Sequence, residues 1–335
     1  MKKNIAVVAG GDSSEKAISV KSAKVVCEHL NKSSTYSAIM VHISKEKWEA
    51  ELDGQFYPID KNDFTFKWET ETISFDAAFV AIHGTPGEDG KLQGYFELIG
   101  MPYTGSDVLN SSFTFNKWHC NAILKQLGYN CATSYLINED YFSEEEYTKL
   151  LEQVTFPCFV KPNSSGSSFG VSKVKTADEF RAAIEEAFQY SSEVMIEAQM
   201  VGREVTCGVT TYENEVIAFP VTEIVSKGEF FDYTAKYEGN SEEITPARLS
   251  EELTARVQEK AKGVYKDLRL KGLARVDFML QKTGVFIIEV NTVPGLTAES
   301  IVPQQAKAAG FSLQELFSAN IEDCIRRKKE KKLKK

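Results

Sequence analysis

The chain has 335 residues, of which 42% are hydrophobic and 26% charged, so it can bury a large core and is not globally disordered. The net charge of −9 disfavours broad nucleic-acid binding, and no stretch approaches the ~20 apolar residues of a transmembrane helix. The six cysteines are scattered without CxxC or metal-ligand spacing, which favours reduced thiols and a cytoplasmic protein.

Strand and helix patterns alternate over the first part of the chain and predict an α/β domain over residues 1–105. The expected elements are a strand buried on both faces over Ile5–Ala9, a helix capped by Asp12 or Ser13, a strand over Ser37–Ile43, a hairpin over Trp48–Ile59 that turns at Asp53-Gly54, and a strand over Ala77–Ile82.

Two further units follow, over residues 106–200 and 201–335. The expected elements of the middle unit are a helix over Thr114–Leu127, strands near Ala132–Ile137 and Pro157–Lys161, a helix from Thr176 to about Tyr190, and a strand over Val194–Glu197. Those of the last unit are two strands flanking Glu213-Asn214, a polar lid over Ser226–Pro246, a helix over about Glu251–Leu268, a hairpin, and a final helix from Ser312.

The chain ends in a basic tail. Residues 326–335 include eight basic side chains and one acidic one. Such a charge run predicts a frayed, solvated helix end rather than a stable membrane anchor. Weak attraction to an anionic membrane surface is the alternative.

The hairpin over Ala274–Gly295 contains the most informative set of polar residues. If the two strands pair symmetrically about Thr283, Asp277 lies opposite Glu289 and Arg275 opposite Asn291. All four side chains then project from one face, and the core face is filled by Val276, Phe278, Ile288 and Val290.

Two carboxylates and an amide oxygen at this spacing are the hard oxygen ligands that Mg²⁺ prefers, with phosphate and water completing its shell. Arg275 adds a planar donor for a phosphate or carboxylate. The alternative is a solvent-facing hairpin with cross-strand ion pairs. The turn Asn291-Thr-Val-Pro-Gly295, which leaves the strand beside this cluster, favours the metal site.

Three other segments have the composition of binding loops. Lys161–Gly170 is rich in glycine and serine, so its backbone N–H groups can approach an anion, although it could also be a flexible hairpin tip. His83–Gly90 follows an apolar strand, where α/β proteins place ligands, or forms a surface turn. Glu15 follows Asp12 by three residues, so it either binds a substrate or completes a capping box.

Together these segments resemble the D-alanine–D-alanine ligase family of the ATP-grasp superfamily nearly end to end. The motifs that match are Gly10-Gly-Asp-Ser-Ser-Glu15, His83-Gly-x-x-Gly-Glu-Asp-Gly90, the loop Lys161–Gly170, Arg275-Val-Asp277, and Glu289-Val-Asn291-Thr-x-Pro-Gly295. The resemblance implies an α/β fold (α+β in part), in which an ATP-grasp fold follows an N-terminal Rossmann-like domain. It also implies a homodimer, with ATP and D-alanine as small-molecule substrates.

The resemblance also implies a role for each matching residue. Two Mg²⁺ (or Mn²⁺) ions would be held by Asp277, Glu289 and Asn291, with Glu289 bridging them. The ATP phosphates would contact Lys117, Lys161 and Lys236, and the adenosine would contact Glu197, Ala198, Met200, Glu204 and Phe230. The first D-alanine would face Glu15 and His83, and the second amino acid and the intermediate would face Arg275, Gly295, Ser300 and Ile301. On closure, Tyr237 would hydrogen-bond towards Ser167 and Glu15.

Other functions remain open at this stage. The same mechanism can join D-alanine to D-lactate or D-serine, and the Lys236-Tyr237 pair favours the dipeptide by resemblance. A different class of protein, a catalytically inactive nucleotide-binding regulator, is disfavoured because the metal ligands, the arginine and the lysines are all present.

Overall fold

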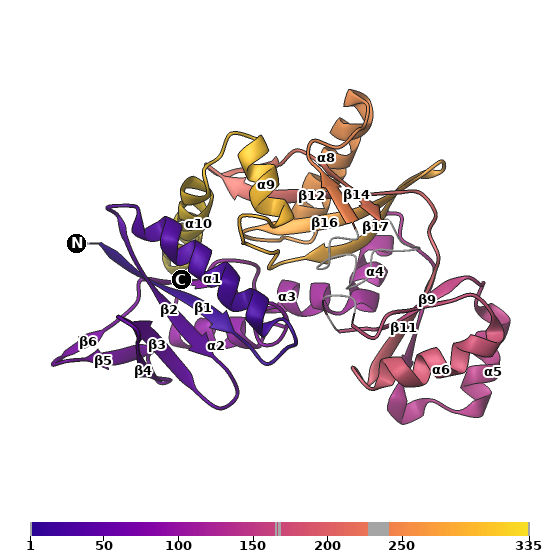
Figure 1. Cartoon of the computed structure of the whole chain (residues 1–335), viewed down its shortest axis with the longest axis horizontal. Coiled ribbons are helices and arrows are strands. Elements are labelled where there is room, and N and C mark those ends of the chain that lie inside the picture. Colours follow the sequence, from indigo (N-terminus) through magenta and orange to yellow (C-terminus); the bar gives the residue numbers. More distant parts are fainter. Residues whose placement is uncertain (1, 165, 167–168, 227–240, 334–335) are drawn as a thin grey trace.

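The computed structural model describes residues 2–164, 166, 169–226 and 241–333, and their strands form three sheets (Figure 1). Each sheet comes from one continuous part of the chain. The first contains strands between residues 3 and 80, the second between 134 and 198, and the third between 203 and 291. The predicted division at residues 105 and 200 is compatible with these spans and stays a prediction.

The first sheet has the strand order β6-β5-β4-β3-β2-β1-β7, and β1 runs parallel to β2 and β7. Both parallel neighbours bury β1 among apolar side chains, which explains its continuous apolar run. The elements are β1 (Lys3–Gly10), α1 (Lys16–Asn31), β2 (Tyr36–Ile43), β3 (Trp48–Leu52), β4 (Gln55–Asp60), β5 (Thr65–Trp68), β6 (Glu71–Ile73), β7 (Ala77–Val80), α2 (Lys91–Ile99) and α3 (Val108–Phe115).

The second sheet has the order β10-β9-β11-β8, and β9–β10, β9–β11 and β11–β8 are antiparallel pairs. Helix α6 packs on β9, β10 and β11. The elements are α4 (Lys117–Gln126), β8 (Ser134–Asn138), a 3₁₀ turn η1 (Glu139–Tyr141), α5 (Glu144–Gln153), β9 (Cys158–Pro162), β10 (Ser172–Val174), α6 (Ala177–Phe188) and β11 (Glu193–Ala198).

The third sheet has the order β15-β14-β12-β16-β17, and β13 also pairs with β12. Helices α8 and α9 both contact β12. The elements are β12 (Arg203–Tyr212), β13 (Glu215–Ala218), β14 (Thr222–Ser226), β15 (Ser241–Ile244), α8 (Glu251–Asp267), β16 (Ala274–Gln281), β17 (Gly284–Asn291), α9 (Ile301–Ala308) and α10 (Leu313–Leu333).

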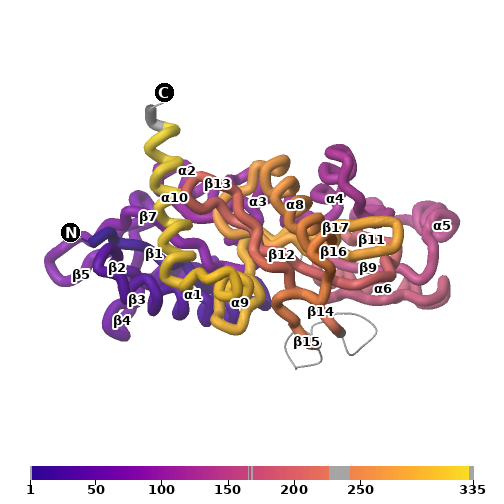
Figure 2. Tube along the Cα trace, turned by 90° about the horizontal axis from the view of Figure 1, so that it is seen from above, coloured from indigo at the N-terminus to yellow at the C-terminus, as the bar shows by residue number. Residues whose placement is uncertain are grey.

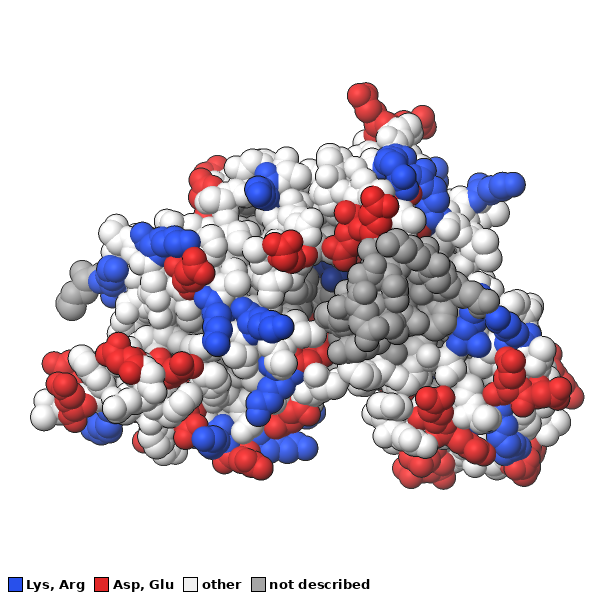
Figure 3. Space-filling view, viewed as in Figure 1, with Lys and Arg blue, Asp and Glu red and all other residues white. Residues whose placement is uncertain are grey.

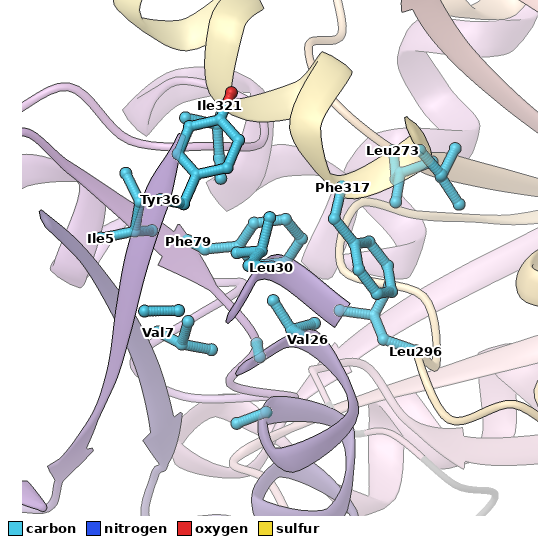
Figure 4. Packing of buried hydrophobic residues seen from close by; sticks show 14 of the residues in the cluster. Ile5, Val7, Val26, Leu30, Tyr36, Phe79, Leu273, Leu296, Phe317 and Ile321 are labelled. Atoms are coloured by element: carbon cyan, nitrogen blue, oxygen red, sulfur yellow. The ribbon is translucent and has the colours of Figure 1, made fainter. Parts of the chain in front are cut away.

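Helix α10 joins the last part of the chain to the first sheet. It contacts α1, β7 and β12, and Figure 4 shows Phe317 of α10 beside Leu273 and Leu296 in one buried cluster. The rings of Phe317 and Phe79 meet edge to face with centroids 5.6 Å apart. This shared core therefore fixes the position of the first sheet relative to β12 and β16.

The basic tail is more ordered than predicted. Helix α10 continues to Leu333, and in Figure 2 it extends away from the body of the protein towards the C-terminus. Arg327 forms an ion pair with Asp323 at 2.8 Å and donates to the carbonyl oxygen of Tyr103 at 3.3 Å. Lys331 pairs with Glu97 at 3.1 Å. The prediction of a frayed end is therefore wrong for these residues, because they have partners on the first unit.

Two predicted helix starts are also corrected. Helix α1 begins after Glu15, whose side chain makes no capping hydrogen bond, and Asp12 instead accepts from the amide of Lys45 at 3.0 Å. The helix expected from Thr114 is two helices, because Asn116 adopts an extended conformation and caps α4 by accepting from the amide of His119.

Figure 3 shows acidic and basic side chains interspersed over the visible face. Within the part of the chain that the structure describes, no helix combines the length and apolar character needed to cross a bilayer.

Candidate functional site: a cleft between the three sheets

The hairpin of β16 and β17 pairs Asp277 with Glu289 and Arg275 with Asn291, so the predicted cross-strand pairing is confirmed. The turn differs from the prediction. Gln281 pairs with Gly284 across a two-residue turn, and a β-bulge follows between Asp277 and Phe278. The bulge inserts one residue into β17, which restores the symmetric pairing at the polar end.

The bulge also changes which isoleucine is buried. Ile287 is 1% exposed and belongs to the core with Val276, Phe278 and Val290, whereas Ile288 is partly exposed and lines a cleft. The prediction that Ile288 faces the core is therefore wrong. The extra residue reverses the alternation of side chains between the turn and the polar cluster.

The side chains of Arg275 on β16 and Thr206 on β12 hold the Asp277 carboxylate. Arg275 donates from Nε and Nη2 to its two carboxylate oxygens, each at 2.8 Å, and the Thr206 hydroxyl donates to Oδ1 at 2.5 Å. Burial would lower the pKa of Arg275, but the Asp277 carboxylate outweighs it and raises this pKa, so the guanidinium stays charged. A permanently cationic arginine therefore lies beside the proposed metal ligands.

The other two proposed metal ligands adjoin the same carboxylate. The Asn291 amide nitrogen lies 3.1 Å from Oδ2 of Asp277 and 3.5 Å from Oε1 of Glu289. Lys117 Nζ lies 3.8 Å from Oε2 of Glu289. The three proposed metal ligands are thus two carboxylates and one amide. Among the described residues, no group of three His, Cys, Asp or Glu side chains is placed to hold a metal ion.

A buried ion pair occupies the side of the cleft formed by the second sheet. Lys161 Nζ and Glu197 Oε2 are 2.7 Å apart, and both side chains are buried. Asn121 of α4 donates to the other carboxylate oxygen of Glu197 at 3.2 Å. The pair lies on neighbouring antiparallel strands, β9 and β11, so sheet pairing fixes its geometry. Ala198 at the end of β11, Met200 after it and Glu204 on β12 of the third sheet also line the cleft.

His83 connects the first unit to the loop after β17. Its Nδ1 is 2.9 Å from the carbonyl oxygen of Val293, and its Nε2 is 3.2 Å from the hydroxyl of Ser22. Burial lowers the pKa of His83, so the ring is neutral near pH 7, with Nδ1 donating to the carbonyl and Nε2 accepting from the hydroxyl. A surface-turn position for His83 is excluded by its 5% exposure.

Glu88 is a cleft residue to which the sequence assigned no role. Its two carboxylate oxygens accept from the amides of Gly84 at 2.7 Å and Val293 at 3.3 Å. Burial, followed by the nearby charge of Glu15, raises the pKa of Glu88 to about 8. The only sequence signal was an acidic side chain inside the glycine-rich segment after an apolar strand, and that pattern does not reveal burial.

Glu15 lines the cleft opposite the glycine- and serine-rich loop. A Cβ placed on Gly166 would lie 2.2 Å from Oε2 of Glu15, so the loop approaches this carboxylate more closely than any other residue type would allow. The capping-box alternative for Glu15 is not supported, because its side chain does not cap α1.

Gly295, Ser300 and Ile301 also line the cleft, before and at the start of α9. The Ser300 hydroxyl is 2.8 Å from the Thr297 hydroxyl and does not cap the helix. A Cβ on Gly295 would lie 2.7 Å from Oγ of Ser300, so the glycine allows these two segments to approach.

The structure brings these residues together in one cleft of about 890 Å³, a size suited to a small-molecule site. Four predicted site residues, Ser167, Phe230, Lys236 and Tyr237, lie outside the described residues, as does most of the predicted lid. The described end of that segment forms β15, which pairs with β14, and the lid role stays a prediction. The fifteen others all line the cleft: Glu15, His83, Lys117, Lys161, Glu197, Ala198, Met200, Glu204, Arg275, Asp277, Glu289, Asn291, Gly295, Ser300 and Ile301.

The first sheet and the two sheets that enclose the cleft define the class: an α/β protein with an ATP-grasp fold and an N-terminal domain. Two family descriptions match the chain, "D-ala D-ala ligase N-terminus" over residues 4–106 and "D-ala D-ala ligase C-terminus" over residues 123–322. The chain belongs to the D-alanine–D-alanine ligase family and is an ATP-dependent ligase.

Relatives and solved structures agree with this assignment. The chain is 49% identical to a D-alanine–D-alanine ligase of Flavobacterium johnsoniae and 46% identical to one of Phocaeicola vulgatus, in each case covering 96% of this chain and 98% or 99% of the relative. The structure of the VanG D-Ala:D-Ser ligase from Enterococcus faecalis has a TM-score of 0.85 at 34% identity, covering 96% of this chain and 99% of that one. That of the D-alanine–D-alanine ligase from Coxiella burnetii has a TM-score of 0.86 at 29% identity, covering 99% and 96%.

Proposed function

We propose that this chain joins two D-alanine molecules into D-alanyl-D-alanine for peptidoglycan precursor synthesis, with hydrolysis of ATP to ADP and phosphate. The observation that carries the proposal is the single cleft lined by all fifteen described site residues. Relatives named D-alanine–D-alanine ligase at 45–49% identity support the choice of substrate.

The reaction has two steps. A carboxylate oxygen of the first D-alanine attacks the γ-phosphorus of ATP, and ADP leaves. The amine of the second D-alanine then attacks the carbonyl carbon of the acyl phosphate and loses a proton, and inorganic phosphate leaves. Both steps build negative charge on oxygen, so fixed cations and backbone donors lower their barriers.

The residues of the cleft supply that charge and alignment. We assign Lys117 and Lys161 to the ATP phosphates, and Glu197, Ala198, Met200 and Glu204 to adenosine. Phe230 and Lys236 complete the nucleotide site by resemblance. Arg275 is already oriented by Asp277, so its charge can stabilise the tetrahedral intermediate without reorganising.

The first amino acid would face residues of the first unit, and the second would face residues at the start of α9. We assign Glu15 and His83 to the first D-alanine, with Ser167 and Tyr237 completing that side. The neutral ring of His83 is held on both nitrogens, which favours a positioning role over proton transfer. Gly295, Ser300 and Ile301 would receive the second amino acid.

The donor set fits a magnesium site. Asp277, Glu289 and Asn291 would hold one or two Mg²⁺ (or Mn²⁺) ions, with the ATP phosphates and water as further ligands. A bound ion would neutralise phosphate charge and polarise the transferred group. The clustering of the Asp277 and Glu289 carboxylates around the Asn291 amide supports the assignment, because carboxylate and amide oxygens are the ligands that Mg²⁺ prefers.

The test is release of phosphate from ATP and Mg²⁺ with single amino acids or pairs, and identification of the product by mass. D-Alanine alone should give the dipeptide. Equal use of L-alanine would overturn the substrate assignment. A mixed product with D-serine would favour the second candidate, a D-alanine–D-serine ligase, which the likeness to the VanG structure supports. ATP binding without any turnover would indicate the inactive regulator.

We further propose a cytoplasmic homodimer built from three units, 1–105, 106–200 and 201–335. The six cysteines are all free thiols, which supports a reducing compartment. Leu98 and Leu109 are 89% and 71% exposed on the contacting helices α2 and α3, and apolar side chains there suit a subunit interface. Light scattering of the wild type and of Leu98→Lys should show a dimer that the substitution weakens. A wild-type monomer would overturn this proposal.

A further inference from the structure

Gln305 is a fully buried glutamine whose amide completes the hydrogen bonding of a β-strand edge. It lies on α9, one turn after Ser300 and Ile301, and is 0% exposed. Its Oε1 accepts from the amide of Gly208 at 2.8 Å, and its Nε2 donates to the carbonyl oxygen of Thr206 at 2.9 Å. The side chain thus takes the place of a neighbouring strand.

The edge of β12 needs such a partner at this point. The strand pairs with β14 over residues 204–206 and with β13 over residues 209–212, so two residues fall between the ladders. Unpaired backbone groups buried there would destabilise the folded protein, because they would lose their hydrogen bonds to water without gaining others. Gln305 satisfies the amide of Gly208 and a carbonyl of Thr206, and its Nε2 also donates to the hydroxyl of Thr222 at 2.9 Å.

Gly208 makes this contact possible. A Cβ added there would lie 2.7 Å from Oε1 of Gln305, 2.9 Å from Cδ2 of Phe219 and 3.3 Å from Cγ2 of Val302. The missing side chain lets α9 approach the sheet closely enough for the amide to reach the strand. Gly208 and Gln305 therefore form one matched contact.

The two strand residues that Gln305 contacts lie directly opposite the catalytic strand residues. Thr206 pairs with Asp277, and Gly208 pairs with Arg275, across the β12–β16 ladder. The Thr206 hydroxyl also bonds the Asp277 carboxylate. Helix α9 is in contact with β12, and Figure 1 shows these two elements side by side. The start of α9 is thereby held at a fixed offset from Arg275 and Asp277.

We propose that Gln305 is a positioning residue that aligns the second amino acid with the reacting carbonyl, an inference that rests on the proposed function. Strand β12 is held by three other strands, whereas α9 has eight residues and packs against β12 and α10. Loss of the Gln305 amide therefore moves α9 more than β12. Small misalignment of two reactants is costly because joining them depends on proximity.

The test compares Gln305→Met with a matched control, Gln258→Met. Gln258 on α8 donates to the carbonyl oxygen of Phe219 at 3.0 Å. The control substitution therefore removes a similar hydrogen bond from a side chain that is not on α9. Rates of phosphate release against D-alanine at saturating ATP are fitted to a two-site rate law. Gln305→Met should raise the KM of the second D-alanine about tenfold, with the KM values for ATP and the first D-alanine within about twofold of wild type.

A second variant guards against misfolding. Gly208→Ala displaces the same amide and should raise the same KM. The KM of the double variant should be no higher than that of the more impaired single variant, because both substitutions remove the same contact. If Gln305→Met and Gln258→Met lose the same thermal stability and neither changes the second KM selectively, Gln305 is merely structural and the proposal fails.

A separate measurement distinguishes failure of this proposal from failure of the proposed function. Amide hydrogen exchange over residues 301–308 needs no substrate. Gln305→Met should exchange faster there than wild type and Gln258→Met, even if the wild type forms no dipeptide. Unchanged exchange in α9 would overturn the anchoring role whatever the reaction proves to be.

Discussion

Glu88→Gln should stabilise the protein, and the gain should grow as the pH rises. The carboxyl has a pKa of about 8 in the folded protein against 4.5 as its ordinary value, because burial and the Glu15 charge disfavour ionisation. Below pH 4.5 the group is protonated in both states, so it costs nothing. As the pH rises from 4.5 to 8, the unfolded state ionises first and stability is lost. The full pKa shift lowers the free energy of unfolding by about 5 kcal/mol, and about 3 kcal/mol of this loss is present at pH 7.

Contact with water in the cleft reduces these values, so we expect a gain of about 2 kcal/mol or more at pH 8.5. The glutamine keeps the size of the side chain and an oxygen that can accept from the amides of Gly84 or Val293. Urea unfolding at pH 5, 7 and 8.5 measures the free energy of unfolding. Glu28→Gln, on the exposed face of α1, is the control and should show no gain that grows with pH. A stability difference for Glu88→Gln that is flat or falls with pH would refute the assigned pKa.

Three further substitutions test the site. Glu289→Gln should reduce turnover at least about 100-fold while leaving the circular dichroism spectrum unchanged, and near-normal activity would contradict its role in metal binding. Lys161→Met should raise the KM for ATP and cost about 3–5 kcal/mol in urea unfolding, because it leaves the Glu197 carboxylate buried without its partner. Glu223→Gln should cost about 1–2 kcal/mol at pH 7, and acid titration should show this loss vanish as the pH falls from 4.5 towards 2, because hydrogen bonds from Arg248 and Arg203 lower the pKa of Glu223 to about 2.

The sequence was most informative where structure is local. The strands β1, β2 and β7 follow from short runs of apolar residues. The hairpin of β3 and β4 follows from the turn at Asp53 and Gly54, two residues that both have a positive φ. The pairing of Asp277 with Glu289 could also be predicted, because the two residues lie on neighbouring strands joined by a short turn. The exclusion of a transmembrane helix needed only the apolar runs.

The bulge beside Asp277 shows where local patterns fail. Isoleucine stands at both 287 and 288, so nothing in the sequence distinguishes the core residue from the cleft residue. The choice depends on packing against β12 and on the position of the turn, which the sequence alone does not give. Helix α9 was not predicted at all, because eight residues with a proline at the third position form too weak a pattern.

The sequence by itself determined the chemistry: two carboxylates and an amide on one hairpin face, an arginine beside them, and a glycine- and serine-rich loop. Only the tertiary structure decided which distant groups share an environment. It places the His83 ring against Val293, raises the pKa of Glu88 by burial, and joins Gln305 to Gly208 across 97 positions of sequence. Burial and long-range hydrogen bonds depend on how sheets and helices pack, so no local pattern in the chain specifies them.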